Sequence, residues 1–122
     1  LMFYADFLMF KEYGVGISGL TYSALPYGNV PNHFKVLYGV FDEVEEVDDE
    51  KPYFKPLSVC DMNVFNDNEI KVLEYVADKL ARQASTALSE TNHQEDAWLK
   101  YKHDTKLLVP FSEAFSLKAL AF

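Results

Sequence analysis

The sequence has little cysteine and no long apolar run. Cys60 is the only cysteine among the 122 residues. No internal disulfide can therefore form, which suits a reducing compartment. The longest apolar stretch, residues 1–10, is interrupted by Asp6 and is about half as long as a membrane-spanning helix must be. It also lacks the basic flank and the cleavage site of a signal peptide. We therefore expect a cytoplasmic protein with no membrane partner.

Basic residues are also few. Eleven Lys and Arg residues oppose 19 Asp and Glu residues, and the formal net charge is -8. Seven of the acids lie in residues 42–50. No basic stripe is available to neutralise phosphates, so direct binding of nucleic acid or of an anionic membrane is not expected. The acidic segment is most simply a solvated loop, and its alternative role is to attract a basic partner.

Large apolar side chains are abundant. Hydrophobic residues make up 49% of the chain and aromatic residues 16%, which excludes a disordered segment. A chain of this length can bury one core, so we predict a single domain over residues 1–122. The apolar pattern begins at Leu1 without a capping residue or an initiator Met, which favours a fragment of a longer protein.

Periodicity predicts an α+β domain that is mostly α, with a minor β-hairpin or short sheet. Helices are expected near residues 1–13, 31–41, 67–83 and 111–119. Residues 14–30, rich in Gly, Pro and Tyr, are compatible with a short strand or hairpin. Pro52 and Pro56 exclude a central strand nearby, and a short edge strand at residues 57–61 is possible.

Several local signals refine these elements. Gly14 is expected to end the first helix. Asn66 and Glu69 have the spacing of a capping box for the helix at 67–83. Trp98 is expected to be largely buried near that helix, and the last helix should turn Phe115 and Leu117 inward.

A nucleotide motif occurs at residues 14–19, which read G-V-G-I-S-G. The dinucleotide fingerprint needs a strand before the glycines and a helix after them. Here a predicted helix precedes the glycines and β-prone residues follow them. We therefore expect a helix stop and a flexible turn, and no bound nucleotide or other cofactor.

The histidines and the lone cysteine do not form a metal site. His33, His93 and His103 lack ligand spacing, and no second cysteine is present. His93 lies near Glu95 and could act as a general acid or base, although no nucleophile accompanies it. Its structural alternative is a hydrogen bond from Ser89. We expect no catalytic residue, and we expect Cys60 to be a small packed residue.

Asp6 is an acid within an apolar helix. Burial of a carboxylate requires a partner. A backbone N–H, an Arg or a Lys of the same fold is the expected partner, and a place on a binding surface is the alternative.

Three stretches together resemble the Panacea domain family, also described as the SocA-like antitoxin or phage-associated GepA-type domain. Residues 1–7 (LMFYADF) are similar to the K-L-L-Y-x-A-D-F helix of that family. The family's first helix and the Lys before Leu1 are absent, so the resemblance implies a fragment that lacks the N-terminal helix or an upstream DNA-binding segment. Residues 17–31 (ISGLTYSALPYGNVP) resemble its I-T-G-x-x-Y-x-A-L-P-Y-G-P-V-P, and residues 88–98 (LSETNHQEDAW) resemble its L-S-x-x-S-H-x-x-x-A-W. The matching positions are Tyr4, Asp6, Tyr22, Pro26, Tyr27, Gly28, Ser89, His93 and Trp98.

The resemblance implies an antitoxin of a bacterial or phage toxin–antitoxin module. Such domains bind a cognate toxin directly, and at least one delivers its toxin to a protease. Two positions depart from the pattern: Asn29 replaces a Pro, and Asn92 replaces a Ser or Thr. Two other functions stay open, a small enzyme that uses His93 and a regulatory domain of a DNA-binding transcriptional regulator.

Overall fold

The computed structural model describes residues 1–33, 44–47, 53–56 and 61–122. The chain divides into two compact units, one formed by residues 1–32 and 65–122 and the other by residues 33–64. Each unit is described by itself. Helices predominate over two short antiparallel strand pairs, which confirms the predicted α+β class with mostly α structure.

The first helix, α1 (Met2–Tyr13), is buried along most of its length. Its residues are apolar on nearly every side, as is typical of a helix enclosed by other elements. Gly14 follows the helix in the left-handed region at φ 78°, and its N–H donates to the carbonyl of Phe10. Only glycine adopts this conformation without steric cost. The predicted helix and its stop are both confirmed.

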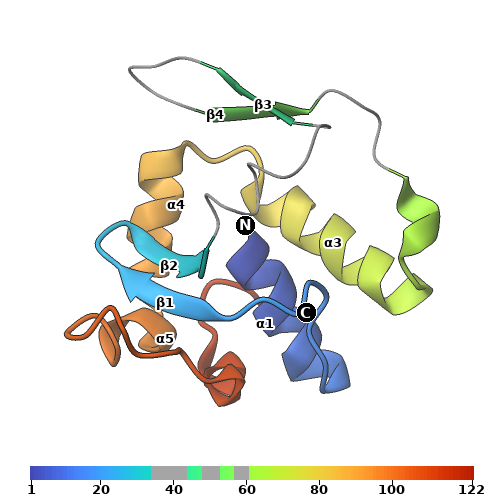
Figure 1. Ribbon diagram of the computed structural model, residues 1–122. Helices are drawn as coiled ribbons and strands as arrows, with labels where there is room; N and C mark the ends of the chain where they lie inside the picture. Colours follow the sequence, from blue (N-terminus) through green and yellow to red (C-terminus); the bar gives the residue numbers. More distant parts are fainter. Residues whose placement is uncertain (34–43, 48–52, 57–60) are drawn as a thin grey trace. The chain divides into compact units, whose positions relative to one another are not determined.

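Helix α1 lies at the centre of its unit (Figure 1) and contacts α3, β2 and η2. Aromatic rings fill much of the space around it. Phe7 stacks on Phe111 with ring centroids 4.6 Å apart and meets Tyr22 edge-on at 5.7 Å. Phe3 lies 4.3 Å from Phe7. Such ring pairs add to the free energy that burial already contributes.

The strands β1 (Tyr22–Leu25) and β2 (Gly28–Pro31) form an antiparallel hairpin. Leu25 pairs with Gly28, so Pro26 and Tyr27 make a two-residue turn. This confirms the hairpin alternative for residues 14–30. Beyond the paired strands, the N–H of Val109 donates to the Tyr22 carbonyl at 2.8 Å.

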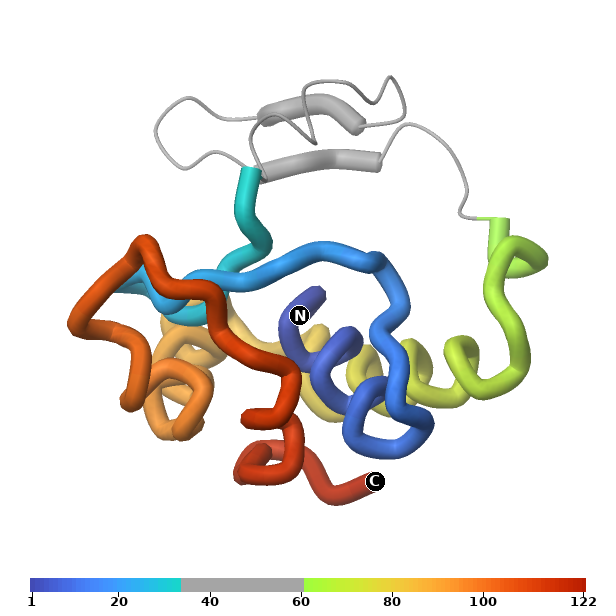
Figure 2. Tube along the Cα trace, turned by 60° about the horizontal axis from the view of Figure 1, so that its bottom comes forward, coloured from blue at the N-terminus to red at the C-terminus, as the bar shows by residue number. Residues whose placement is uncertain are grey.

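The segment between α1 and β1 turns back alongside the helix (Figure 2) and encloses Asp6, which is 2% exposed. One carboxylate oxygen of Asp6 accepts the N–H groups of Ile17 and Ser18 at 2.7 and 2.8 Å. The other accepts the hydroxyls of Ser18 and Tyr22, both at 2.5 Å. The predicted partner of Asp6 is therefore a pair of backbone N–H groups, joined by two hydroxyls.

The helix α3 (Asp67–Leu80) begins with the predicted capping box. Asn66 accepts the Glu69 N–H at 2.8 Å, and the Glu69 carboxylate accepts the Asn66 N–H at 2.9 Å. Val72, Val76 and Leu80 form its buried face. Three short elements follow, namely α4 (Ser85–Asn92), α5 (Asp96–Leu99) and the 3-10 helix η2 (Phe111–Ser116).

The C-terminal prediction was wrong in two respects. A 3-10 helix that ends at Ser116 replaces the α-helix expected at 111–119, and Phe115 is 66% exposed. A 3-10 helix has about three residues per turn, so Phe111, Ala114 and Leu117 share the inward face. Leu117 was therefore placed correctly, whereas the α-helical spacing assigned Phe115 to the wrong face.

The helix predicted at 31–41 does not begin at Pro31. Pro31 is the last residue of β2, paired with Tyr22, and the N–H of Asn32 donates to the Thr21 carbonyl at 2.9 Å. His33 then adopts a positive φ of 61°. The hairpin hydrogen bonds thus hold this proline in a strand. The rest of that prediction, residues 34–41, lies outside the described residues.

In the second unit, β3 (Val44–Val47) pairs with β4 (Tyr53–Pro56), and the 3-10 helix η1 (Met62–Val64) follows. The acidic segment was predicted to be a loop, which is wrong for residues 44–47. Val, Tyr and Phe favour strands. Val44 and Val47 belong to β3, and Tyr53 and Phe54 belong to β4. An edge strand was expected at 57–61, and of these residues the structure describes only Asp61. Residues 57–60, with Cys60, lie outside the described residues.

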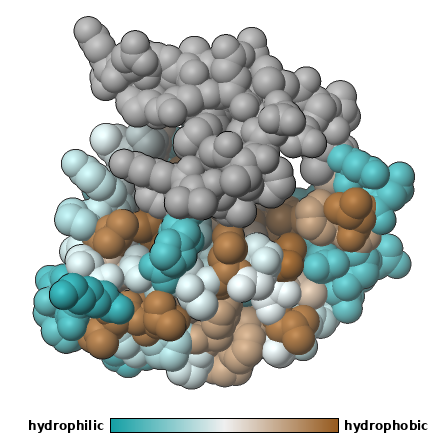
Figure 3. Space-filling view, in the orientation of Figure 1, coloured by the Kyte–Doolittle hydropathy of each residue, from teal (hydrophilic) through white to brown (hydrophobic). Residues whose placement is uncertain are grey.

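No helix in the described parts of the chain is long and apolar enough to span a membrane. Apolar side chains do reach the surface at several places between polar ones, as Figure 3 shows for one face.

We predict that Asp6→Asn lowers the free energy of unfolding by roughly 2–3 kcal/mol, as expected for a buried charged acceptor with several donors. The amide offers one acceptor oxygen, and its NH2 group meets groups that also donate. Urea denaturation followed by tryptophan fluorescence measures the change. Asp78→Asn, at an exposed position of α3, is the matched control and should change stability by less than about 0.5 kcal/mol. Equal effects of the two substitutions would contradict this role of Asp6.

Candidate functional site

The turn of the β1–β2 hairpin is held by side chains from α4 and from the segment that follows it. Three consecutive carbonyls each accept one hydrogen bond. The Leu25 carbonyl accepts from Trp98 Nε1 at 2.7 Å. The Pro26 carbonyl accepts from His93 Nε2 at 2.9 Å, so this ring nitrogen carries the hydrogen. The Tyr27 carbonyl accepts from Ser89 Oγ at 2.6 Å. We call Ser89, His93 and Trp98 the turn clamp.

The clamp side chains also contact one another. The rings of His93 and Trp98 stack with centroids 4.0 Å apart, and the Lys102 ammonium lies 5.2 Å from the Trp98 ring. Two predictions are thereby corrected. The Ser89 hydroxyl bonds to the turn and not to the His93 ring. Trp98 is only half-buried and bonds to β1, because its indole N–H needs an acceptor that the Leu25 carbonyl supplies.

A second contact between hairpin and helix joins Asn29 of β2 to Asn92 of α4, both buried. Asn92 Oδ1 accepts the Asn29 backbone N–H at 2.6 Å and the Asn29 Nδ2 at 3.0 Å. Gly28 makes this approach possible. A Cβ at Gly28 would lie 2.9 Å from Asn92 Oδ1, and its φ is +132°. A larger residue there would crowd the Asn92 side chain and would be strained at this φ.

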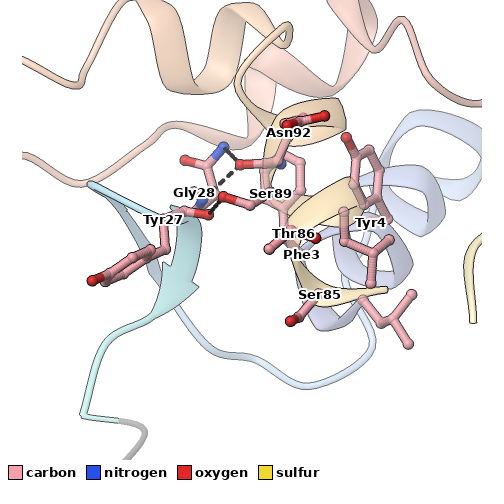
Figure 4. Close-up of a pocket in the computed structure, with 12 residues that line it drawn as sticks. Phe3, Tyr4, Tyr27, Gly28, Ser85, Thr86, Ser89 and Asn92 are labelled. Atoms are coloured by element: carbon pink, nitrogen blue, oxygen red, sulfur yellow. Dashed lines mark hydrogen bonds between the residues drawn. The ribbon is translucent and has the colours of Figure 1, made fainter. Parts of the chain in front are cut away.

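These contacts leave the side chain of Tyr27 free of α4, and it is 84% exposed. Figure 4 shows its ring pointing away from the helix while Ser89 and Asn92 point toward the hairpin. Between the turn and α4 lies a groove of about 650 Å³. It is lined by Leu1, Phe3, Tyr4, Tyr27, Gly28, Asn29, Ser85, Thr86, Leu88, Ser89, Glu90 and Asn92.

The electrostatics beside the groove are set by two buried groups. The Tyr4 hydroxyl has no hydrogen-bond partner of ordinary geometry, although the Asn92 amide is close enough to affect it. Burial raises the pKa of Tyr4, and the nearby Glu95 raises it further. Glu95, 1% exposed, accepts the N–H groups of Lys118 and Ala119 at 3.0 to 3.1 Å. Burial raises the pKa of Glu95, and these N–H donors only partly oppose the rise.

The glycine-rich segment at residues 14–19 binds a side chain of the same protein. Its backbone N–H groups at Ile17 and Ser18 converge on an anion, as in a phosphate-binding loop. The anion here is the carboxylate of Asp6, from the same chain. A bound phosphate would have to displace this carboxylate, so the segment supports the fold and offers no nucleotide site.

The structure gathers the sequence-predicted residues into two clusters. Asp6 and Tyr22 meet beside the segment between α1 and β1, whereas Tyr4, two residues earlier on α1, lines the groove. The remaining predicted residues meet at the hairpin turn, namely Pro26, Tyr27, Gly28, Ser89, His93 and Trp98. Sequence reasoning noted Asn29 and Asn92 only as departures from a pattern. It did not find their contact, nor the roles of Thr86, Leu88 and Glu90 in the groove.

Residues 1–99 match the family described as antitoxin SocA-like, Panacea domain. This match includes both clusters and most of the chain. The protein belongs to the SocA-like Panacea domain family. No curated protein and no solved structure matches the chain significantly.

Membership of the Panacea family agrees with the resemblance of the three stretches and is consistent with an antitoxin role. The contact of Asn29 with Asn92 gives the two departures a joint explanation. A Pro at position 29 has no N–H to donate, so it needs no acceptor at position 92. Among the described residues, no group of three or more His, Cys, Asp or Glu side chains could hold a metal ion.

We predict that the two asparagines are energetically coupled by more than about 1 kcal/mol. Asn92→Ala alone leaves a buried backbone N–H of Asn29 without an acceptor, which should cost roughly 1–3 kcal/mol. In an Asn29→Pro background that N–H is absent, so the same Asn92→Ala change should cost less. Urea denaturation of the four proteins in the double-mutant cycle measures the coupling. Additive effects would contradict it.

We predict that Glu95 makes stability fall as pH rises. Because the pKa of Glu95 is raised in the folded protein, the folded state binds more protons than the unfolded state above the ordinary Glu value of about 4.3. The contribution of Glu95 to the free energy of unfolding is therefore most favourable below that value. It declines as pH rises toward and through the pKa that Glu95 has in the folded protein. The stability difference between wild type and Glu95→Gln, measured by urea denaturation at several pH values, should decline in this window. Parallel curves would contradict the prediction.

Proposed function

We propose that this domain is an antitoxin that neutralises a co-encoded toxin by direct binding in the cytoplasm. The observation that carries the proposal is the family match over residues 1–99. A binding role needs an accessible surface and no reactive group. The exposed Tyr27 and the neighbouring groove supply such a surface, and tyrosine is enriched where interface energy concentrates.

The geometry of His93 supports binding over the enzymatic alternative. A general acid or base must reach its substrate with a free ring nitrogen. Nε2 of His93 already donates to the Pro26 carbonyl at 2.9 Å, and the ring stacks on Trp98 at 4.0 Å, so only Nδ1 is left to exchange a proton with a substrate. His93 is also absent from the lining of the groove. This position suits a residue that holds the turn.

We predict that cells expressing the neighbouring gene alone stop growing, and that co-expression of this protein restores growth. The measurement is colony formation from two separately inducible plasmids, and co-purification of the two products tests direct contact. An Asp6→Ala variant, which should unfold, serves as a control for expression of a non-functional chain. A neighbouring product that is harmless alone, or equally toxic in the presence of this protein, would contradict the antitoxin role.

A further inference from the structure

We infer that the toxin docks on the face formed by Tyr27 and the groove, through an apolar side chain flanked by a Lys or Arg. This inference rests on the proposed function and names the contact surface and its chemistry. It does not depend on the second unit, because every residue that lines the groove belongs to residues 1–32 and 65–122.

The first step is the rigidity of Tyr27. An exposed aromatic residue on a mobile loop loses conformational entropy when it binds, and preorganisation avoids this loss. Tyr27 stands on a two-residue turn whose carbonyls at Leu25, Pro26 and Tyr27 are each bonded to a clamp side chain. Its backbone is thus held while 84% of the residue stays exposed. Side chains that only completed a core would not present an aromatic ring to solvent in this way.

The second step is the chemistry of the groove. Phe3, Tyr4 and Leu88 line it with apolar or aromatic surface, and Ser85 and Thr86 add hydroxyl groups. Its volume of about 650 Å³ falls in the range of roughly 300–1,000 Å³ typical of ligand-binding clefts. An apolar side chain of a partner can therefore be buried there, with hydroxyl groups to meet adjacent polar atoms.

The third step is charge. Glu90 is the sole acidic side chain in the lining, which contains no Lys, Arg or His. Glu90 is exposed and no described cation forms an ion pair with it. The unit that carries the groove has 11 Asp and Glu residues against 8 Lys and Arg residues, a formal charge of -3. A partner that places a Lys or Arg beside its apolar side chain is attracted by Glu90. A nucleic-acid phosphate backbone, by contrast, would meet no Lys, Arg or His side chain in the lining.

A second copy of this chain is a poorer occupant. A two-fold contact brings the same surface of both copies together. Each copy would then present Glu90 to the other, on a unit whose 11 acids and 8 bases give it a formal charge of -3. Like charges oppose such a contact, so the charge pattern favours a basic protein partner.

The test measures binding of the purified neighbouring gene product to the full chain by biolayer interferometry. Tyr27→Ala should weaken affinity at least about tenfold, mainly through faster dissociation, as for other central aromatic residues. Glu90→Lys should lower the association rate and reduce its dependence on salt. Tyr13→Ala and Glu74→Lys are matched controls, since both residues are exposed and neither lines the groove. Each should leave affinity within about twofold, the range of mutations away from an interface. Circular dichroism checks that all variants fold.

The outcomes separate the two proposals. No binding of the neighbouring product to wild type would overturn the antitoxin function and this inference with it. Binding to wild type with unchanged affinity for Tyr27→Ala and Glu90→Lys would overturn the docking face alone. Sedimentation measurements on the protein by itself complete the test. A dimer that Tyr27→Ala dissociates would assign the face to a second copy and overturn the inference.

Discussion

The structure depends above all on satisfying one buried carboxylate. Asp6 lies in the middle of the central helix at 2% exposure, where an unpaired charge would be prohibitive. Its two oxygens accept two N–H groups and two hydroxyls from the segment that leads into the hairpin. The carboxylate therefore determines where this segment runs, and with it where β1 begins. The hairpin is connected to α1 by hydrogen bonds as well as by ring packing.

The same principle recurs at the other end of the hairpin. Side chains of Ser89, His93 and Trp98 bind the main chain of the turn, and Asn92 binds that of β2. Together these bonds favour one arrangement, and at the buried Asn29–Asn92 contact a lost bond also leaves an unpaired partner. Glu95 does the same for the C-terminal segment through Lys118 and Ala119. Polar side chains on short elements thus join four segments that are distant in the sequence.

This arrangement explains how a small domain can present a binding surface. Short helices and a two-stranded hairpin have little rigidity of their own. The hydrogen bonds to the turn supply it at the position where Tyr27 is exposed. Gly28 leaves room for the Asn92 side chain, since a Cβ at this position would lie 2.9 Å from Asn92 Oδ1. In the function that we propose, the clamp residues act through the shape of the turn and need not touch the toxin.

Local signals alone determined part of this fold. The capping box at Asn66 and Glu69 and the helix stop at Gly14 depend on neighbouring residues only, so the sequence was sufficient for them. Tertiary structure decided the rest. Ser89 and His93 bond to the turn across 62 and 67 residues, and Trp98 to β1 across 73. A periodicity pattern contains no information on such distant acceptors. Likewise, α and 3-10 helices place different residues on their inward face. Packing against α1 therefore decided between the two geometries near Phe115.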